Sequence, residues 1–457
     1  MRRFPTAGDV ALIVLLLLPL AVALPRLGGV FGSPEHWLNW VGRVSGILGL
    51  AMLLLAGAVS CRVPGFDRPF GGLARLWRIH HWLGFAAFML VMLHALALGL
   101  AAVPVSLGAA VATLFPPVSH GAVWLGWLSW AALVVFLAPT FDFFGQPHYQ
   151  RWKRLHLVSA AALLLGLWHA LLLAGEAWPW WLLGGVGLGG IAWRKGFAPR
   201  RRAPYRIEAL TPLARGVVEL VLRPEGGGIR FKAGQFVYLT PLDESLSAGC
   251  NEEHPYTIAS APSDTRLRIG IKDLGDASHA LQAVPLGSRV LVEGPYGEFF
   301  GRRFPERDML WLGGGIGITP FVGGARELAA SDSITGHAHL FYLANSLDRA
   351  YYQEALLAIA AQVAGFTYTS HYYQQQGPFS ETFLRQHCPD YAQREIYICG
   401  PPAMNAHLQR LLAAHGVPAS RIHSEVFDFL SKSAEYPTQA TYWVGMDSAA
   451  STGCACC

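Results

Sequence analysis

Apolar residues form long runs over the first 200 positions of the chain and short, alternating runs after them. A helix rises about 1.5 Å per residue and the hydrocarbon core of a bilayer is about 30 Å thick, so the long runs predict membrane-spanning helices. Six spans are predicted, at residues 10–24, 37–60, 77–100, 121–139, 155–173 and 178–193, and the first is the shortest.

Beyond residue 202 the apolar runs shorten and are interrupted by Gly, Pro and Asp. Alternating stretches at residues 217–222, 235–240 and 266–271 predict a small antiparallel β-barrel. From about residue 305 strands alternate with helices, which predicts a parallel α/β domain. Its strands are expected at residues 308–312, 337–343 and 395–398, and its helices from Pro320 and over 352–364.

These patterns predict a multi-domain membrane protein. We expect a six-helix transmembrane bundle at residues 1–200, an antiparallel β-barrel at 201–303 and a parallel α/β domain at 304–430. Residues 431–457 end in Cys-Ala-Cys-Cys, which is too tight for a full tetrahedral metal site. We expect this segment to be a mobile tail without catalytic work.

The formal net charge of +5 is unevenly distributed. Residues 1–202 hold 16 Lys and Arg against 5 Asp and Glu, and most of the basic residues lie in loops between alternate spans. By the positive-inside rule, both termini are expected in the cytoplasm and the protein in a plasma or inner membrane, with lipid as its partner. No nucleic-acid partner is expected, because the positive charge lies between spans. Cleavage of a signal peptide near Ala23 is an alternative that leaves the other spans unchanged.

Four histidines lie in two of the predicted spans: His80 and His94 in the third, His156 and His169 in the fifth. An ionisable side chain within a bilayer is costly, so a repeated pair indicates a functional site. The spacings separate the two histidines of each helix by about 20 Å. This leaves room for two stacked haems, each held by one histidine from each helix, since haem iron accepts neutral imidazole.

A purely structural alternative is that these histidines only donate hydrogen bonds between helices. The spacing also leaves two details open. Fourteen residues return almost to the same helix face, whereas thirteen fall more than a quarter-turn away, so helix bending or different haem orientations must absorb the mismatch. His81, thirteen residues before His94, is a rival to His80.

Three motifs lie in the second half of the chain. His254-Pro255-Tyr256-Thr257, at a predicted barrel strand, suits a flat redox ring, because the tyrosine can stack and the threonine can hydrogen-bond a ring nitrogen. The run GGGIGITP at residues 313–320 follows a strand, where glycines let backbone amides approach a pyrophosphate, although Pro320 takes the third place of the strict G-x-G-x-x-G spacing. CGPPAM at residues 399–404 ends another strand, at the sheet edge where ligands bind.

In the order of these motifs the chain resembles the ferric reductase and NADPH oxidase superfamily, in which a haem-bearing membrane domain is fused to a ferredoxin–NADP reductase-like module. The resemblance covers about residues 37–430 and includes the histidine pairs, HPYTIAS, GGGIGITP and CGPPAM. The runs KDLG at 272–275 and GPYG at 294–297 also look like landmarks of the family's flavin domain.

The resemblance implies two b-type haems in the membrane domain. His80 and His156 would ligate an inner haem, and His94 and His169 an outer haem. In the family the first histidine stands four residues before a glycine, as His80 does before Gly84, which favours His80 over His81.

The resemblance also implies sites for FAD and NAD(P)H. Tyr256 and Thr257 would contact the isoalloxazine, the glycine-rich loop would cradle the nucleotide, and Cys399 would lie near the nicotinamide. Phe427 or Phe429 resembles the terminal aromatic that covers the flavin. Thr257, Cys399 and Phe429 are then the candidates closest to the chemistry. The cofactor-binding candidates are His254, Pro255, Tyr256, Thr257, Lys272, Gly275, Ser278, Gly314, Gly315, Gly317, Thr319, Pro320, Asn345, Cys399, Gly400, Pro401, Phe427, Phe429 and, for the outer haem, Arg43.

The chain departs from the family in two places. Members that prefer NADPH often carry an arginine where this chain has Asn345, which leaves NADH against NADPH open, with Arg349 as a possible substitute. The family's chain usually stops near the terminal aromatic, so the 28 residues after Phe429 would have to turn away from the flavin.

These inferences predict an NAD(P)H-dependent transmembrane oxidoreductase. Hydride carries two electrons and haem takes one at a time, so a flavin is required between them. On the far face, Arg43 is expected to pair with an outer-haem propionate or a reducible anion rather than to snorkel. Ferric-chelate reduction is expected, because Leu98 stands where oxidase-like members often have a polar residue. The alternatives are superoxide formation from dioxygen, donation to an extracytoplasmic redox partner, and a haem-binding sensor or transporter without turnover.

Overall fold

The computed structural model describes residues 5–28, 33–138, 154–301, 304, 307–331 and 336–425. It divides into two compact units, a helical one that ends at Arg200 and a second one that begins at Arg201. Each unit is described by itself.

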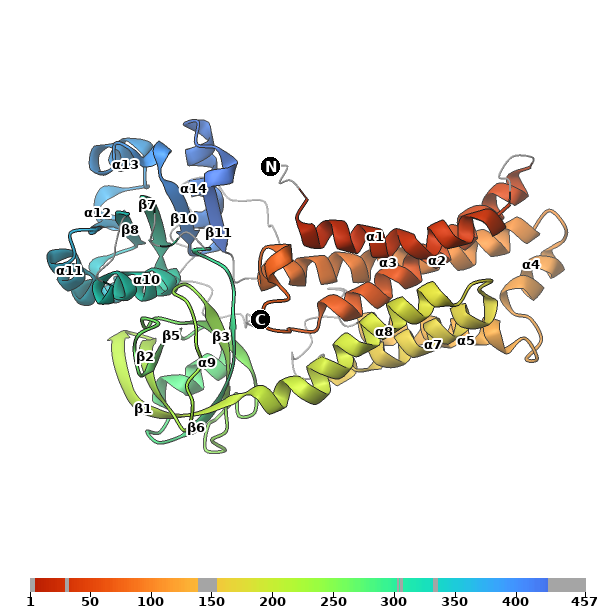
Figure 1. The fold of residues 1–457 in the computed structure, drawn as a ribbon, viewed down its shortest axis with the longest axis horizontal. Coiled ribbons are helices and arrows are strands. Elements are labelled where there is room, and N and C mark those ends of the chain that lie inside the picture. Colours follow the sequence, from red (N-terminus) through yellow and green to blue (C-terminus); the bar gives the residue numbers. More distant parts are fainter. Residues whose placement is uncertain are drawn as a thin grey trace. The chain divides into compact units, whose positions relative to one another are not determined.

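The first unit consists of helices that run lengthwise beside one another (Figure 1). Short 3-10 turns and a π-helical turn continue α1 and α8 at their ends. The helices are α1 (Ala7–Ala23), α2 (Pro34–Val59), α3 (Leu73–Ala102), α4 (Leu107–Leu114), α5 (Gly121–Leu137), α7 (Val158–Leu173) and α8 (Trp178–Ala192).

Three segments of this unit are long and apolar enough to cross a membrane: Ala7–Arg26, Pro34–Val59 and Leu73–Ala102. The later helices α5, α7 and α8 are apolar but have only 17, 16 and 15 residues. A helix needs about 20 residues to cross the hydrocarbon core without help from its flanks. The structure therefore supports three of the six predicted spans by length, and six crossings stay a proposal.

Glycines allow the closest helix contacts in this unit. A Cβ on Gly187 of α8 would lie 2.5 Å from the carbonyl oxygen of Leu54 in α2, and one on Gly190 would lie 3.0 Å from that of Gly57. Close backbone approach of this kind is a common means of packing helices in lipid. Near the C-terminal end of α2 as well, the ion pair between Arg75 and Asp9, at 2.6 Å, ties the start of α3 to α1.

The second unit begins with an antiparallel sheet in the order β4-β3-β6-β1-β2-β5. A bridge between Ile258, which follows β4, and Ile269 of β5 brings the two edge strands together, so the sheet curls. The prediction of an antiparallel β-sheet that curls is confirmed, and full closure into a β-barrel stays a prediction, because a single bridge rather than a full ladder joins the sheet's edges among the described residues. The strands are β1 (Ala203–Ala214), β2 (Val217–Pro224), β3 (Phe236–Pro241), β4 (His254–Thr257), β5 (Leu267–Lys272) and β6 (Arg289–Tyr296), with α9 (Asp276–Ala280) after β5.

A five-stranded parallel sheet follows, in the order β11-β10-β7-β8-β9. Helices α10 and α11 cover one face, and α13 and α14 cover the other (Figure 1). The parallel α/β prediction is confirmed, and two of its strands, β9 and β11, had given no clear signal in the sequence. The elements are β7 (Met309–Gly314), α10 (Thr319–Ala330), β8 (Ala338–Ala344), α11 (Gln353–Gln362), β9 (Phe366–Tyr372), α13 (Glu381–His387), β10 (Glu395–Cys399), α14 (Pro402–Ala414) and β11 (Ile422–Glu425).

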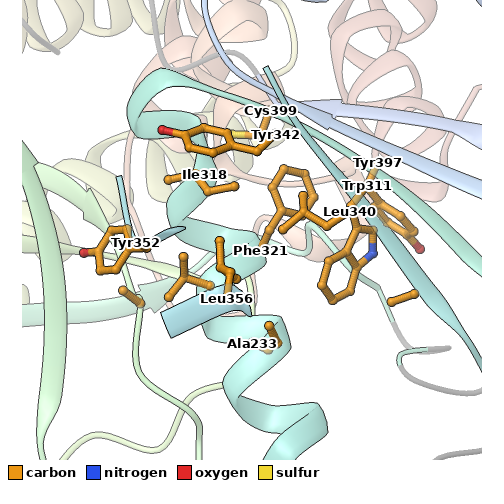
Figure 2. Close-up of a cluster of buried hydrophobic side chains, with 14 of the residues drawn as sticks. Ala233, Trp311, Ile318, Phe321, Leu340, Tyr342, Tyr352, Leu356, Tyr397 and Cys399 are labelled. Carbon is orange, nitrogen blue, oxygen red and sulfur yellow. The ribbon is translucent and has the colours of Figure 1, made fainter. Parts of the chain in front are cut away.

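The two sheets of the second unit share a hydrophobic core. Figure 2 shows Ala233, from the loop before β3, in one cluster with Trp311 and Phe321 of the parallel sheet and its helix. Val217 and Ala259 of the antiparallel part belong to the same cluster. The antiparallel and parallel sheets therefore pack together through one core in this unit.

His339 gives the second unit a dependence on pH. It is 4% exposed in β8, stacks on Phe341 at 4.4 Å and hydrogen-bonds Thr369 at 2.9 Å, and burial lowers its pKa to about 4. In the unfolded chain this histidine is protonated below about pH 6.5, whereas in the folded chain it stays neutral down to about pH 4. The free energy of unfolding should therefore fall as the pH drops from about 6.5 to about 4, by up to about 3 kcal/mol. Thermal melts of the purified full chain at pH 7 and 5 should show a smaller loss in His339→Gln than in the parent. Exposed His415→Gln is the control, and an equal loss in all three proteins would contradict the prediction.

Candidate functional site

The four membrane histidines meet in two pairs. His80 and His94 lie in α3, and His169 lies in α7. The ring centroids of His80 and His156 are 6.1 Å apart, and those of His94 and His169 are 6.3 Å apart. The structure thus brings together the same partners that the sequence predicted.

His156 is not in a helix. The segment predicted as a helix from residue 155 becomes α7 only at Val158, and His156 lies in the turn before it. The thirteen-residue spacing therefore does not measure a rotation about one helix axis.

Backbone carbonyls orient three of the four rings. Nδ1 of His80 donates to Ala56 at 2.9 Å, that of His94 to Gly42 at 2.7 Å, and that of His169 to Ala122 at 2.6 Å. A ring that carries its proton on Nδ1 keeps the lone pair of Nε2 for a metal, and metal-binding histidines are commonly held in this way.

Two glycines leave space for the outer pair. A Cβ on Gly46 of α2 would lie 2.5 Å from Nδ1 of His94, and one on Gly126 of α5 would lie 2.9 Å from Nδ1 of His169. Any larger residue at either position would displace the ring. Sequence reasoning missed both glycines, because a lone glycine in an apolar helix carries no signal about its neighbour across the bundle.

The spacing of the rings fits haem iron. A metal lies about 2.0–2.1 Å from an imidazole nitrogen, which is itself about 1.1 Å from the ring centroid, so two rings on opposite sides of one metal have centroids about 6.3 Å apart. The two observed separations agree with this value. His81 is exposed and its ring lies against Trp82, so the geometry favours His80. Arg43 is exposed on α2 between Gly42 and Gly46, near the outer pair.

In the second unit, the two sequence-predicted loops meet at the edge of the parallel sheet. β7 and β10 are neighbours, and the chain continues from β7 to one side and from β10 to the other, which is the switch point where ligands bind in such folds. A Cβ on Gly317 would lie 2.5 Å from the carbonyl oxygen of Cys399 and 2.7 Å from the Cα of Gly400. The contact requires glycine, and it brings the backbones of the two loops together.

Two side chains that the sequence analysis missed support these loops. The hydroxyl of Tyr342, at the end of β8, donates to the carbonyl oxygen of Gly315 at 3.2 Å and accepts from the amide of Tyr351 at 3.0 Å. The Sδ of Met404 lies 2.2 Å from where a Cβ on Gly314 would be. Met404 closes the CGPPAM motif, and its position in that motif was the available signal.

The flavin candidates lie on the two edge strands that the sheet's curl brings together. Tyr256 and Thr257 of β4 pair with Val237 and Phe236 of β3, and Lys272 ends β5. Beyond β5, the hydroxyl of Ser278 accepts from the amide of Leu274 at 2.8 Å and donates to the carbonyl of Gly275 at 2.9 Å. His254 and Pro255 begin β4 and complete the motif.

The remaining candidates fall at the same sheet edge or outside the described residues. Cys399 is fully buried, and burial raises the pKa of its thiol well above the usual value, so the group is a neutral thiol. Asn345 follows β8, and its backbone carbonyl accepts from Gln374 at 3.0 Å. The candidates that start or follow the two loops are Thr319, Pro320, Gly400 and Pro401. Phe427, Phe429 and the predicted tail at 431–457 lie outside the described residues.

Three family models match successive parts of the chain. Residues 45–167 match a ferric reductase like transmembrane component, residues 205–299 an FAD-binding domain, and residues 311–410 an oxidoreductase NAD-binding domain. The first range contains all of His80, His94 and His156 and ends just before His169, the second contains β4, and the third contains both nucleotide loops.

Characterised relatives match about half of the chain. They include the reductase component of propane 2-monooxygenase from Rhodococcus jostii, 25% identical over 51% of this chain and 65% of its own length. The ferredoxin reductase component of 3-ketosteroid-9-alpha-monooxygenase from Mycolicibacterium smegmatis is 32% identical over 45% of this chain and 60% of its own length. The chain thus spans less than two thirds of the length of these relatives.

Solved structures also resemble half of the chain. The FAD/NAD-binding domain of a nitric oxide dioxygenase from Vibrio cholerae is 25% identical, with a TM-score of 0.43 over 49% of this chain and 98% of its own. The ferredoxin reductase of carbazole 1,9a-dioxygenase is 23% identical, with a TM-score of 0.41 over 50% of this chain and 69% of its own.

Proposed function

Because the chain has the architecture of the ferric reductase and NADPH oxidase superfamily, a transmembrane component fused to FAD- and NAD-binding domains, we propose that it moves electrons across a membrane. They would pass from cytosolic NAD(P)H through FAD and two b-type haems to a ferric chelate on the opposite face. The observation that carries this proposal is the pair of histidine separations, 6.1 and 6.3 Å, which match two rings on one iron.

The residues of the second unit would hold the donor and the flavin. When bound, FAD accepts the two electrons of a hydride and supplies them singly to haem. Backbone amides of the loop at residues 314–317, which follows β7 at the switch point, would bind the nucleotide's phosphates. Tyr256 and Thr257 would orient the isoalloxazine, and the neutral thiol of Cys399 would border the nicotinamide without adding charge.

The residues of the first unit favour electron transfer over ligand sensing. A haem iron held by two imidazoles would serve as an electron carrier rather than as a binding site for a further ligand. His80 and His156 would hold the inner haem, and His94 and His169 the outer one. The carbonyl hydrogen bonds to three of these rings would keep them aligned during repeated oxidation and reduction. These features argue against a haem-binding sensor or transporter.

The surroundings of the outer pair support a ferric chelate as the acceptor. Leu98, one turn past His94, packs its side chain against Gly42, where a Cβ would lie 2.8 Å from it, so an apolar contact takes the place of a polar group. Arg43 beside it is a cation that would attract an anionic chelate or a propionate. Dioxygen and an extracytoplasmic redox partner are the competing acceptors.

An anaerobic absorbance spectrum of the purified protein with FAD tests the proposal. Addition of NADH or NADPH should bleach the flavin and produce the bands of reduced low-spin b-type haem. A ferric chelate added afterwards should restore the oxidised spectrum. Haem bands that appear with dithionite but with neither nucleotide would show that the proposed relay does not operate.

Asn345 should weaken the use of NADPH. It follows β8 at the same sheet edge as the glycine-rich loop, where an arginine would pair with a 2′-phosphate. Asn345→Arg should therefore raise the kcat/KM for NADPH relative to NADH by about tenfold or more, since a charge-assisted pair contributes about 1.5–3 kcal/mol. Flavin reduction with each nucleotide measures this ratio, and Asn345→Gln is the control. An unchanged ratio would mean that the 2′-phosphate lies elsewhere.

A further inference from the structure

One buried carboxylate joins the two sheets of the second unit. The side chain of Glu219 in β2 is 5% exposed, and its oxygens accept from Arg268 of β5 and from Arg326 of α10, each at 3.0 Å. Two guanidinium partners compensate for the burial of the charge. Arg326 lies in α10, which packs on the parallel sheet. This ion triad therefore links the antiparallel sheet, which carries the flavin candidates, to the parallel sheet, which carries the two nucleotide loops.

Arg326 also contacts the backbone of the antiparallel part of the unit. It donates to the carbonyl oxygen of Ala259 at 2.8 Å, and its guanidinium lies 5.7 Å from the ring centroid of Tyr352. One turn earlier in α10, a Cβ on Gly323 would lie 2.9 Å from the carbonyl oxygen of Ile258. The helix therefore presses its Gly323 and Arg326 face against the backbone of residues 258–260.

Both partners of this contact adjoin a cofactor motif. Ala259 comes two residues after Thr257, and α10 begins at Thr319, directly after the glycine-rich loop. On the same side, a Cβ on Gly270 of β5 would lie 3.0 Å from Cγ2 of Thr319. The contact between α10 and residues 258–260 thus sets the distance between the Tyr256-Thr257 strand and the glycine-rich loop.

We propose that Arg326 is a positioning residue for hydride transfer, which holds the glycine-rich loop at a set distance from the Tyr256-Thr257 strand through Glu219 and the Ala259 carbonyl. The proposal rests on the FAD and NAD(P)H sites proposed above. In that reaction a hydride, with both electrons, leaves the dihydronicotinamide, which is oxidised, and joins the flavin, which is reduced. The reacting atoms must approach to about 3–3.5 Å, and a displacement of about 1 Å costs about 100-fold in rate.

The test compares Arg326→Met with Arg385→Met in the full chain loaded with FAD. Arg326→Met leaves Glu219 paired with Arg268, so the buried charge keeps a partner. Arg385 forms an exposed ion pair with Glu381 at 2.6 Å and is a matched control away from the contact. Anaerobic stopped-flow mixing with NADH and with NADPH measures the limiting rate of flavin bleaching and the half-saturating nucleotide concentration.

Arg326→Met should lower the limiting rate by about 10- to 100-fold and change the half-saturating concentration by less than about threefold, with FAD content unchanged. Arg385→Met should match the parent. If Arg326→Met does not retain FAD, Arg326→Lys decides, because it keeps the charge but not the fork that reaches two partners. A limiting rate within twofold of the parent in the variant that retains FAD would overturn the proposal. Absence of bleaching in the parent itself would overturn the proposed function and this role together.

Discussion

Replacement of His94 by alanine should remove one of two haems and stop reduction of an external acceptor, while NAD(P)H still bleaches the flavin. The ring of His94 lies 6.3 Å from that of His169, and its Nδ1 donates to Gly42, so it is the oriented half of the outer pair. The pyridine haemochrome assay should give one haem per chain instead of two. Ferric-chelate reduction should fall by at least about 100-fold, because loss of an iron ligand exceeds the 10–100-fold effect of losing a ligand's supporting group.

His81→Ala is the matched control for this prediction. His81 is an exposed histidine in the same helix, with its ring against Trp82, and its removal should leave two haems and normal acceptor reduction. His169→Ala should reproduce the His94 result, because either variant breaks the same pair. Two haems in His94→Ala, or one haem in His81→Ala, would refute the assignment of the ligands.

Addition of a single methyl group at Gly317 should stop reduction of the flavin by NAD(P)H. In Gly317→Ala the new Cβ would lie 2.5 Å from the carbonyl oxygen of Cys399, and both sides of the contact are backbone, which cannot turn away as a side chain can. The two nucleotide loops would be forced apart. Because a shift of about 1 Å at a reacting centre costs about 100-fold, the rate of flavin bleaching should fall by that factor or more.

Gly227→Ala is the control for this change. Gly227 lies in the same unit, and no atom within 4 Å would meet its Cβ, so the rate should equal that of the parent. FAD content should stay normal in both variants, since the flavin candidates lie on the antiparallel sheet. A Gly317→Ala protein that bleaches at the parent's rate would mean that the nucleotide does not use this loop.

The sequence predicted most of what depends on local pattern. The parallel sheet was expected because strands and helices alternate, and β7, β8 and β10 begin within one residue of the expected starts. The antiparallel part was expected from alternation, and its strands β2, β3 and β5 also lie where the pattern placed them. The way in which the edges of that sheet meet came only from the structure, because it depends on one bridge between Ile258 and Ile269 rather than on any periodicity.

Helix ends were predicted less well than helix existence. The fifth predicted span started at residue 155, but α7 begins at Val158 and leaves His156 in a turn. Apolar runs continue across the ends of a helix, so hydropathy alone does not place its first turn. The length of the later helices, 15–17 residues, likewise came only from the structure.

The sequence by itself determined the candidate motifs and their order along the chain: histidine pairs in apolar segments, then a strand with an adjacent tyrosine and threonine, then two loops at strand ends. These are properties of residue type and near neighbours, which a linear pattern records. The tertiary structure alone decided that His156 lies in a turn before its helix, and that Gly46 and Gly126 make room for rings on other helices. It also decided that Glu219 and Arg326, over 100 residues apart, share one ion pair. Such contacts depend on how distant segments pack, and residue spacing along the chain does not encode that packing in a readable form.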